Sequence, residues 1–119
     1  MKLLLVVFFG SGMGGVVRYL LSKAVNPNGV YAFPLHTFVI NFLACLLLGC
    51  LFGLGDRLSF NVRVLLVAGF CGGFSTFSAF SGETLLLLQQ GQFFQATLYI
   101  CLSVVVCIAA TGIGMWITD

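Results

Sequence analysis

Residues 69–83 read GFCGGFSTFSAFSGE and lie within a long apolar segment of the chain. Two adjacent glycines and a run of hydroxyl side chains therefore stand where a membrane helix is normally most apolar. A helix that breaks there leaves unpaired carbonyls at the end of one half and unpaired N–H groups at the start of the other. Because lipid cannot satisfy these groups, the break must lie inside protein or beside a polar cavity. The stretch predicts an interrupted membrane helix that offers carbonyls to a cation and N–H groups to an anion.

Helix packing is a second explanation for these glycines. Gly69 and Gly73 form a GxxxG pair, as do Gly10 with Gly14 and Gly49 with Gly53. Such pairs let two membrane helices approach closely. Packing explains the glycines, but it does not explain why hydroxyl groups follow them.

The rest of the chain is equally apolar. Of its 119 residues, 61% are hydrophobic and 7% are charged, which is too little polar side chain to cover a small water-soluble globule. The five basic residues are scattered, so nucleic-acid binding has no electrostatic support. We predict an all-α membrane protein with one domain, residues 1–119, and four helices that span about residues 2–21, 34–54, 63–88 and 93–117. Polar turns are expected at residues 26–29, 55–57 and 89–92.

The basic residues barely favour one orientation in the membrane. Lys2, Arg57 and Arg63 fall on one side of the four-helix topology, while Arg18 and Lys23 fall near the other. Positive residues near the ends of spans set orientation, so this bias is weak. The chain either inserts one way with little bias, or inserts both ways and pairs with an inverted copy of itself.

The sequence does not indicate an enzyme. His36 is the only histidine, and no nucleophile, base and acid stand at spacings that would form a catalytic group. Five cysteines fall inside the predicted spans without Cys-x-x-Cys spacing. We interpret them as small apolar packing residues.

Polar side chains at membrane depth are few and need partners. Asn41 lies near the middle of the second span, and Thr37 precedes it by one turn on the same face. An amide cannot be satisfied by its own helix, so Asn41 needs a polar partner, a water-filled path or a ligand. A polar stripe also follows the fourth span, where Thr111 is expected to bond its own helix; the stripe comprises Tyr99, Ser103, Cys107 and Thr111.

Phenylalanines alternate with the hydroxyl groups of the third span. Phe70, Phe74, Phe77 and Phe80 recur at helical spacing, and Glu83 is the acidic residue at the far end of this stretch. Aromatic rings are electropositive at their edges. Rings set edge-on beside hydroxyl and amide donors therefore predict a small, dry site for a compact anion, with Phe70 as ordinary core.

These features resemble the Fluc (CrcB) fluoride channels. The motifs that carry the resemblance are Gly-x-Gly-Gly-x-x-Arg-Tyr at 12–19, Pro-x-x-Thr-x-x-x-Asn at 34–41, Gly-Gly-Phe-Ser-Thr-Phe-Ser-x-Phe-Ser-x-Glu at 72–83, and the stripe in the fourth span. Members are four-helix proteins of the cell inner membrane that form antiparallel, dual-topology homodimers. They let fluoride leave the cytoplasm passively, which lowers its toxicity.

The resemblance also implies roles for individual residues. The carbonyls of Gly72 and Ser75 are expected to hold a structural sodium ion on the dimer axis. Arg18 and Glu83 are expected at the ends of the pore. Phenylalanine edges and polar donors line the fluoride pathway, for which the expected residues are Asn41, Phe77, Phe80, Thr37, Thr76, Ser78, Tyr99 and Ser103.

Four positions depart from the family pattern. Ser75 replaces a usual threonine, which leaves the carbonyl ligand in place. Ala79 and Cys107 stand where hydroxyl groups are common, so the polar track loses donors there. His36 replaces a usual glycine, and we interpret it as an interfacial anchor.

Two other functions share this architecture. A proton-coupled small multidrug exporter also has four spans, but it needs a carboxylate deep in the first helix, where this chain has none. A non-transporting assembly subunit would use its glycines only for packing.

Overall fold

The structure is a computed structural model that describes residues 1–27 and 33–119. Every regular element within these residues is helical, as predicted. In chain order the elements are α1 (Lys2–Val25), α2 (Leu35–Leu54), η1 (Gly55–Arg57), α3 (Phe60–Arg63), η2 (Val64–Cys71), α4 (Gly72–Phe74), α5 (Phe77–Gln89) and α6 (Phe93–Thr118). Over the described residues, 4 helical segments are long and apolar enough to cross a membrane, and α3, η2, α4 and α5 together form the third of them.

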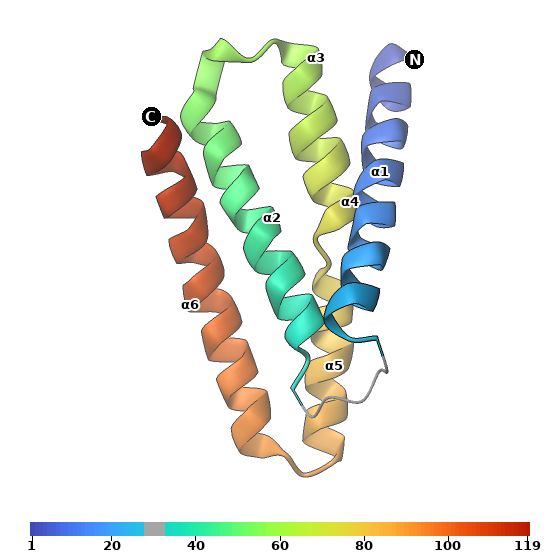
Figure 1. The fold of residues 1–119 in the computed structure, drawn as a ribbon, viewed down its shortest axis with the longest axis vertical. Coiled ribbons are helices and arrows are strands. Elements are labelled where there is room, and N and C mark those ends of the chain that lie inside the picture. Colours follow the sequence, from blue (N-terminus) through green and yellow to red (C-terminus); the bar gives the residue numbers. More distant parts are fainter. Residues whose placement is uncertain (28–32) are drawn as a thin grey trace.

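The four segments run alternately up and down (Figure 1). Both termini and the α2–α3 connection lie at one end of the molecule, and the α5–α6 connection lies at the other. At the end with the termini, Arg63 reaches the Asp56 carboxylate at 3.3 Å. Asn28 and Gly29 of the predicted first turn lie outside the described residues.

Glycines bring α1 against the upper half of the third segment. A Cβ atom on Gly10 would stand 2.6 Å from the carbonyl oxygen of Leu65, and one on Gly69 would stand 3.0 Å from the Gly10 Cα. Gly14 and Gly73 face the opposing backbone with as little room. The packing explanation of these glycines is therefore confirmed, and we call this contact the α1 seam.

A second glycine contact joins α2 to α6. A Cβ atom on Gly114 would stand 2.7 Å from the Cys50 amide nitrogen, and one on Gly49 would stand 2.8 Å from the Thr111 carbonyl carbon. The hydroxyl of Thr118 also donates to the Cys50 carbonyl at 2.8 Å. We call this contact the α6 seam. The two seams bring helix backbones together where any larger side chain would collide.

The third segment is interrupted near its centre, as predicted. Helical structure continues through Gly72 and Gly73 and ends at Phe74, after which Ser75 (ψ 157°) and Thr76 (ψ 115°) are extended. The break therefore follows the glycine pair instead of lying on it. Gly73 is held in a helix by the α1 seam, so the backbone leaves the helix at the next residues that are free of this contact.

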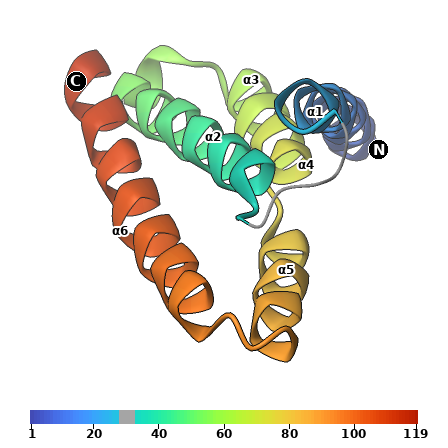
Figure 2. The same cartoon turned by 60° about the horizontal axis from the view of Figure 1, so that its bottom comes forward.

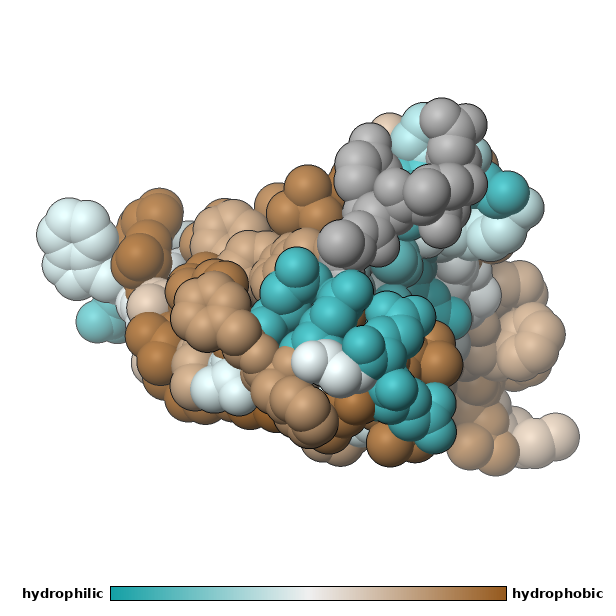
Figure 3. Space-filling model, turned by 90° about the horizontal axis from the view of Figure 1, so that it is seen from below, coloured by the Kyte–Doolittle hydropathy of each residue, from teal (hydrophilic) through white to brown (hydrophobic). Residues whose placement is uncertain are grey.

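Beyond the break, α5 turns away from α1 and α2 to meet the start of α6 (Figure 2). Figure 3 looks onto this end of the molecule, where hydrophilic residues gather between apolar flanks. The α5–α6 connection contributes Gln89, Gln90 and Gln92. Large apolar side chains are exposed along the helices, including Leu4 at 70% and Phe8 at 71%, as expected for surfaces that face lipid.

Candidate functional site

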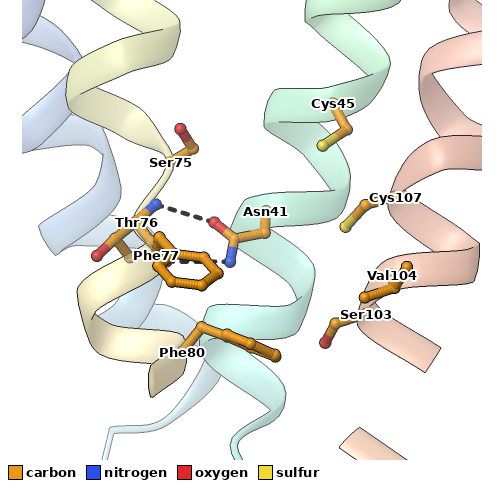
Figure 4. Close-up of a pocket in the computed structure, with 9 residues that line it drawn as sticks. All are labelled: Asn41, Cys45, Ser75, Thr76, Phe77, Phe80, Ser103, Val104 and Cys107. Carbon is orange, nitrogen blue, oxygen red and sulfur yellow. Dashed lines mark hydrogen bonds between the residues drawn. The ribbon is translucent and has the colours of Figure 1, made fainter. Parts of the chain in front are cut away.

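One side chain of α2 holds the interrupted backbone. The Asn41 Oδ1 accepts a hydrogen bond from the Thr76 N–H at 3.0 Å, and its Nδ2 donates to the Thr76 carbonyl at 3.2 Å (Figure 4). The amide thus replaces the acceptor that the break takes from the Thr76 N–H, and it adds a hydrogen bond to the Thr76 carbonyl at the start of α5. Because the Asn41 nitrogen carries two hydrogens, one N–H remains for another acceptor. We call this arrangement the Asn41 clamp.

Hydroxyl groups form hydrogen bonds with backbone groups on both sides of the break. The Ser75 hydroxyl donates to the Cys71 carbonyl at 2.8 Å. The Thr76 hydroxyl caps α5 by accepting the Ala79 N–H at 3.2 Å, and it lies 3.2 Å from the Ser78 hydroxyl. Three of the hydroxyl groups that helix packing left unexplained, those of Ser75, Thr76 and Ser78, therefore belong to the break itself.

The break also frees carbonyls at the end of the first half-helix, and those of Gly72 and Ser75 are among them. In a continuous helix the Gly72 carbonyl would accept the Thr76 N–H, which here donates to Asn41. The Ser75 carbonyl would accept the Ala79 N–H, which here donates to the Thr76 hydroxyl. Both carbonyls lose their helical donors, so they fit the oxygen ligands that a hard cation requires.

A pocket of about 250 Å³ opens beside the break, between α2, α5 and α6 (Figure 4). The Ser103 hydroxyl is buried there without a hydrogen-bond partner among the described residues, and it points toward Phe80. We call this space the break pocket. It brings together five of the residues predicted for an anion pathway, namely Asn41, Thr76, Phe77, Phe80 and Ser103.

The phenylalanine stripe divides at the break. Above it, Phe70 and Phe74 stack with ring centroids 5.5 Å apart and pack in the core. Below it, the ring centroids of Phe77 and Phe80 lie 5.6 Å apart, with 38° between the ring planes. The ring centroid of Phe80 also lies 5.0 Å from that of Tyr99. Phe77 is 77% exposed, so this ring forms an outer wall of the break pocket in the single chain.

Glu83 of α5 gathers three donors from two other helices. Its Oε1 accepts the Thr37 hydroxyl at 2.6 Å, and its Oε2 accepts the Tyr99 hydroxyl at 2.9 Å. The Nε2 of His36 lies 3.1 Å from Oε1. Thr37 and Tyr99 were both predicted for the fluoride pathway, and the structure brings their hydroxyl groups onto one carboxylate.

A wider space of about 510 Å³ lies on the other side of Thr76, and we call it the vestibule. The two residues predicted at the pore ends, Arg18 and Glu83, both line it. Thr76 lines the vestibule and the break pocket alike, so the Asn41 clamp stands between the two spaces. The other polar residues of the vestibule are Tyr19, Ser22, His36, Thr37 and Ser78.

Sequence reasoning did not place His36 in the vestibule, which it lines beside Glu83. A signal was present, because a carboxylate in a membrane span needs nearby donors. It also missed that Cys45 and Cys107 point their thiols into the break pocket (Figure 4). Thr111 donates to the Cys107 carbonyl at 3.1 Å, so its expected bond within its own helix is confirmed.

Side-chain metal ligands are not gathered anywhere in residues 1–27 and 33–119. These residues contain no group of three or more His, Cys, Asp or Glu side chains that could hold a metal ion. A cation at this site would depend on backbone oxygens.

Comparison with known proteins adds to this geometry. Residues 5–115 match the family model described as CrcB-like protein, Camphor Resistance (CrcB). A fluoride-specific ion channel FluC from Phocaeicola vulgatus is 42% identical, with 100% of both chains covered. Proteins of the same name from Flavobacterium psychrophilum (42% identical, 97% of this chain and 95% of the relative) and Coxiella burnetii (43%, 95% and 94%) are similar over nearly as much.

Proposed function

The chain belongs to the CrcB family, and we propose that it is a passive, fluoride-selective ion channel. The observation that carries this proposal is the full-length match to relatives named as fluoride-specific ion channels. The protein is a multi-pass membrane protein and not an enzyme. We further propose that it lies in the cell inner membrane and lets fluoride leave the cytoplasm, which lowers fluoride toxicity.

The proposed pathway joins the vestibule to the break pocket. Fluoride enters past Arg18, whose positive charge attracts anions. It then exchanges water for the free N–H of Asn41 and the unpartnered hydroxyl of Ser103. The edges of Phe77 and Phe80 complete the enclosure with weak positive charge.

In this proposal, selectivity for fluoride follows from the size of the anion and from the number of hydrogen-bond donors around it. The break pocket offers hydrogen-bond donors on a few side chains, and none of its lining residues is a carboxylate. Fluoride is small enough to be surrounded by such groups, whereas chloride would hold them too far apart for good hydrogen bonds. The relatives lend no support to a proton-coupled multidrug exporter.

We propose that the working channel is an antiparallel homodimer of two inverted copies. The support in the single chain is that Phe77 and Ser78 are exposed directly beside the extended backbone of the break. Polar groups and irregular backbone at membrane depth must be covered by protein or face water. A second copy over this face would satisfy that requirement and close the outer wall of the break pocket.

A structural sodium ion is also proposed, held by the carbonyls of Gly72 and Ser75. The support is that both carbonyls lose their helical N–H donors at the break. When bound, sodium would supply positive charge to these oxygens and fix the ends of the two half-helices. Replacing sodium with a large organic cation during purification is expected to reduce both fluoride flux and thermal stability.

The proposal is tested by anion efflux from liposomes that contain the purified protein. A fluoride electrode is expected to report rapid passive release, while a chloride electrode reports release near that of protein-free liposomes. Chloride release as fast as fluoride release would contradict the proposed selectivity.

A further inference from the structure

His36 is one of the polar groups of the vestibule that the proposed pathway does not use. Its Nε2 lies 3.1 Å from the Oε1 of Glu83, and the two side chains are only 23% and 21% exposed. The same Glu83 oxygen accepts the Thr37 hydroxyl at 2.6 Å. His36 therefore shares one carboxylate oxygen with a second donor, in a space that an entering anion must cross.

Protonation would change what this imidazole offers. A neutral ring has one N–H and one bare nitrogen, whereas a charged ring donates from both. The Nδ1 of His36 is buried and has no hydrogen-bond partner among the described residues. A proton there adds a buried donor without an acceptor among these residues, so the charge of the ring, and not this N–H, is what an anion in the vestibule would meet.

Protonation would also change the charge balance of the vestibule. The charged and titratable groups around His36 are Glu83 from α5, Tyr99 from α6 through Glu83, and Arg18 and Tyr19 from α1. With a neutral imidazole, the charges of Arg18 and Glu83 offset each other. With a charged imidazole, the lining has one excess positive charge, and such a cleft concentrates anions.

We propose that His36 is a proton-dependent capture residue. Its side chain attracts fluoride into the vestibule when it is charged and does not attract it when it is neutral. This inference rests on the proposed function. It gives the channel a faster fluoride flux in acid.

The test measures fluoride efflux from liposomes between about pH 5 and 8, the range in which imidazole normally changes charge. His36 is the only histidine of the chain. An α-amino group can also titrate near neutral pH, but Met1 lies at the opposite end of α1 from Arg18. Protein-free liposomes at each pH correct for leakage of hydrogen fluoride through lipid.

Wild-type flux is expected to rise about tenfold from the alkaline to the acidic end of this range. His36→Gln keeps an N–H donor without a titratable charge, so its flux should be low and independent of pH. His36→Lys carries a charge across the whole range, so its flux should be high and flat. If the lysine variant fails to fold, the comparison with His36→Gln still decides the question.

Two results would overturn the inference. One is a wild-type profile without a rise in acid, and the other is a His36→Gln profile that keeps the wild-type slope. Fluoride flux that is absent at every pH, in the wild type as well as in the variants, would instead contradict the proposed channel function. The two failures are therefore distinguishable in one experiment.

Discussion

The two sides of the helix break differ in what fills the space between helices. Above it, the α1 seam and the α6 seam bring backbones so close that glycine is required. Below it, α5 diverges, and the break pocket and the vestibule lie where a seam would otherwise continue. The difference indicates that rigid glycine contacts hold the frame, while polar side chains occupy the part that an ion would cross.

The largest effect is expected from breaking a seam. Gly114→Val would push a side chain into the Cys50 backbone, where a Cβ atom has only 2.7 Å of room. Overpacking of this kind costs about 1–3 kcal/mol or more, because neither backbone can move aside. We expect little folded protein on size-exclusion chromatography in detergent.

Gly112→Ala is the matched control for this variant, since nothing lies within 4 Å of its added Cβ atom. It should fold and conduct as the wild type does. Equal yields of both variants would mean that the α6 seam is not the rigid part of the frame.

Phe80→Ile is expected to affect the other region alone. It removes a ring that lines the break pocket and contacts Phe77 and Tyr99. Fluoride efflux should fall close to that of protein-free liposomes, while the protein still elutes as a folded species. Unchanged efflux would remove this ring from the pathway.

Asn41→Ala tests whether the clamp belongs to the frame or to the pathway. The variant loses both hydrogen bonds to Thr76 and the remaining N–H that faces the pocket. We expect a loss of about 1–3 kcal/mol in unfolding free energy, since the part-buried Thr76 N–H loses its acceptor, together with slower fluoride efflux. A stability loss with unchanged efflux would favour an assembly subunit over a channel.

Tyr99→Phe is expected to have a moderate effect. It removes the hydroxyl that donates to Glu83 at 2.9 Å while keeping the ring against Phe80. A hydrogen bond to a charged group contributes about 1.5–3 kcal/mol, so the melting temperature in detergent should fall. Efflux slowed as strongly as in Phe80→Ile would show that the hydroxyl acts on the ion directly.

Cys107→Ser is expected to give the smallest change. The thiol points into the break pocket, where a hydroxyl would restore a donor to the polar track. Fluoride efflux should rise, by less than about threefold, since one neutral hydrogen bond contributes about 0.5–1.5 kcal/mol and water already supplies an alternative. Cys101→Ser on the exposed face is the control and should leave efflux unchanged.

Much of the frame could be predicted from sequence, because it depends on local patterns. The apolar segments, the GxxxG pairs and the hydroxyl groups after Gly73 are all read within a few residues of each other. The exact position of the break was harder to predict from the sequence. It lies at Ser75 and Thr76 because the α1 seam and the Asn41 clamp act on neighbouring residues from two different helices.

The cluster around Glu83 could not be predicted from local patterns. Its donors lie 46 and 16 residues away in sequence, at Thr37 and Tyr99. Each of these residues has a plausible separate role when its helix is considered alone. Only the packing of α2, α5 and α6 decides that one carboxylate takes both hydroxyl groups.

The Asn41 clamp also has a consequence for how the sequence can evolve. Asn41 bonds the backbone of Thr76, not its side chain. Replacement of Thr76 by another small polar residue would therefore leave the clamp intact, whereas no change at position 76 can compensate for loss of the amide at position 41. Mutational tolerance across this contact is one-sided, and a search for coupled substitutions between the two positions should find few.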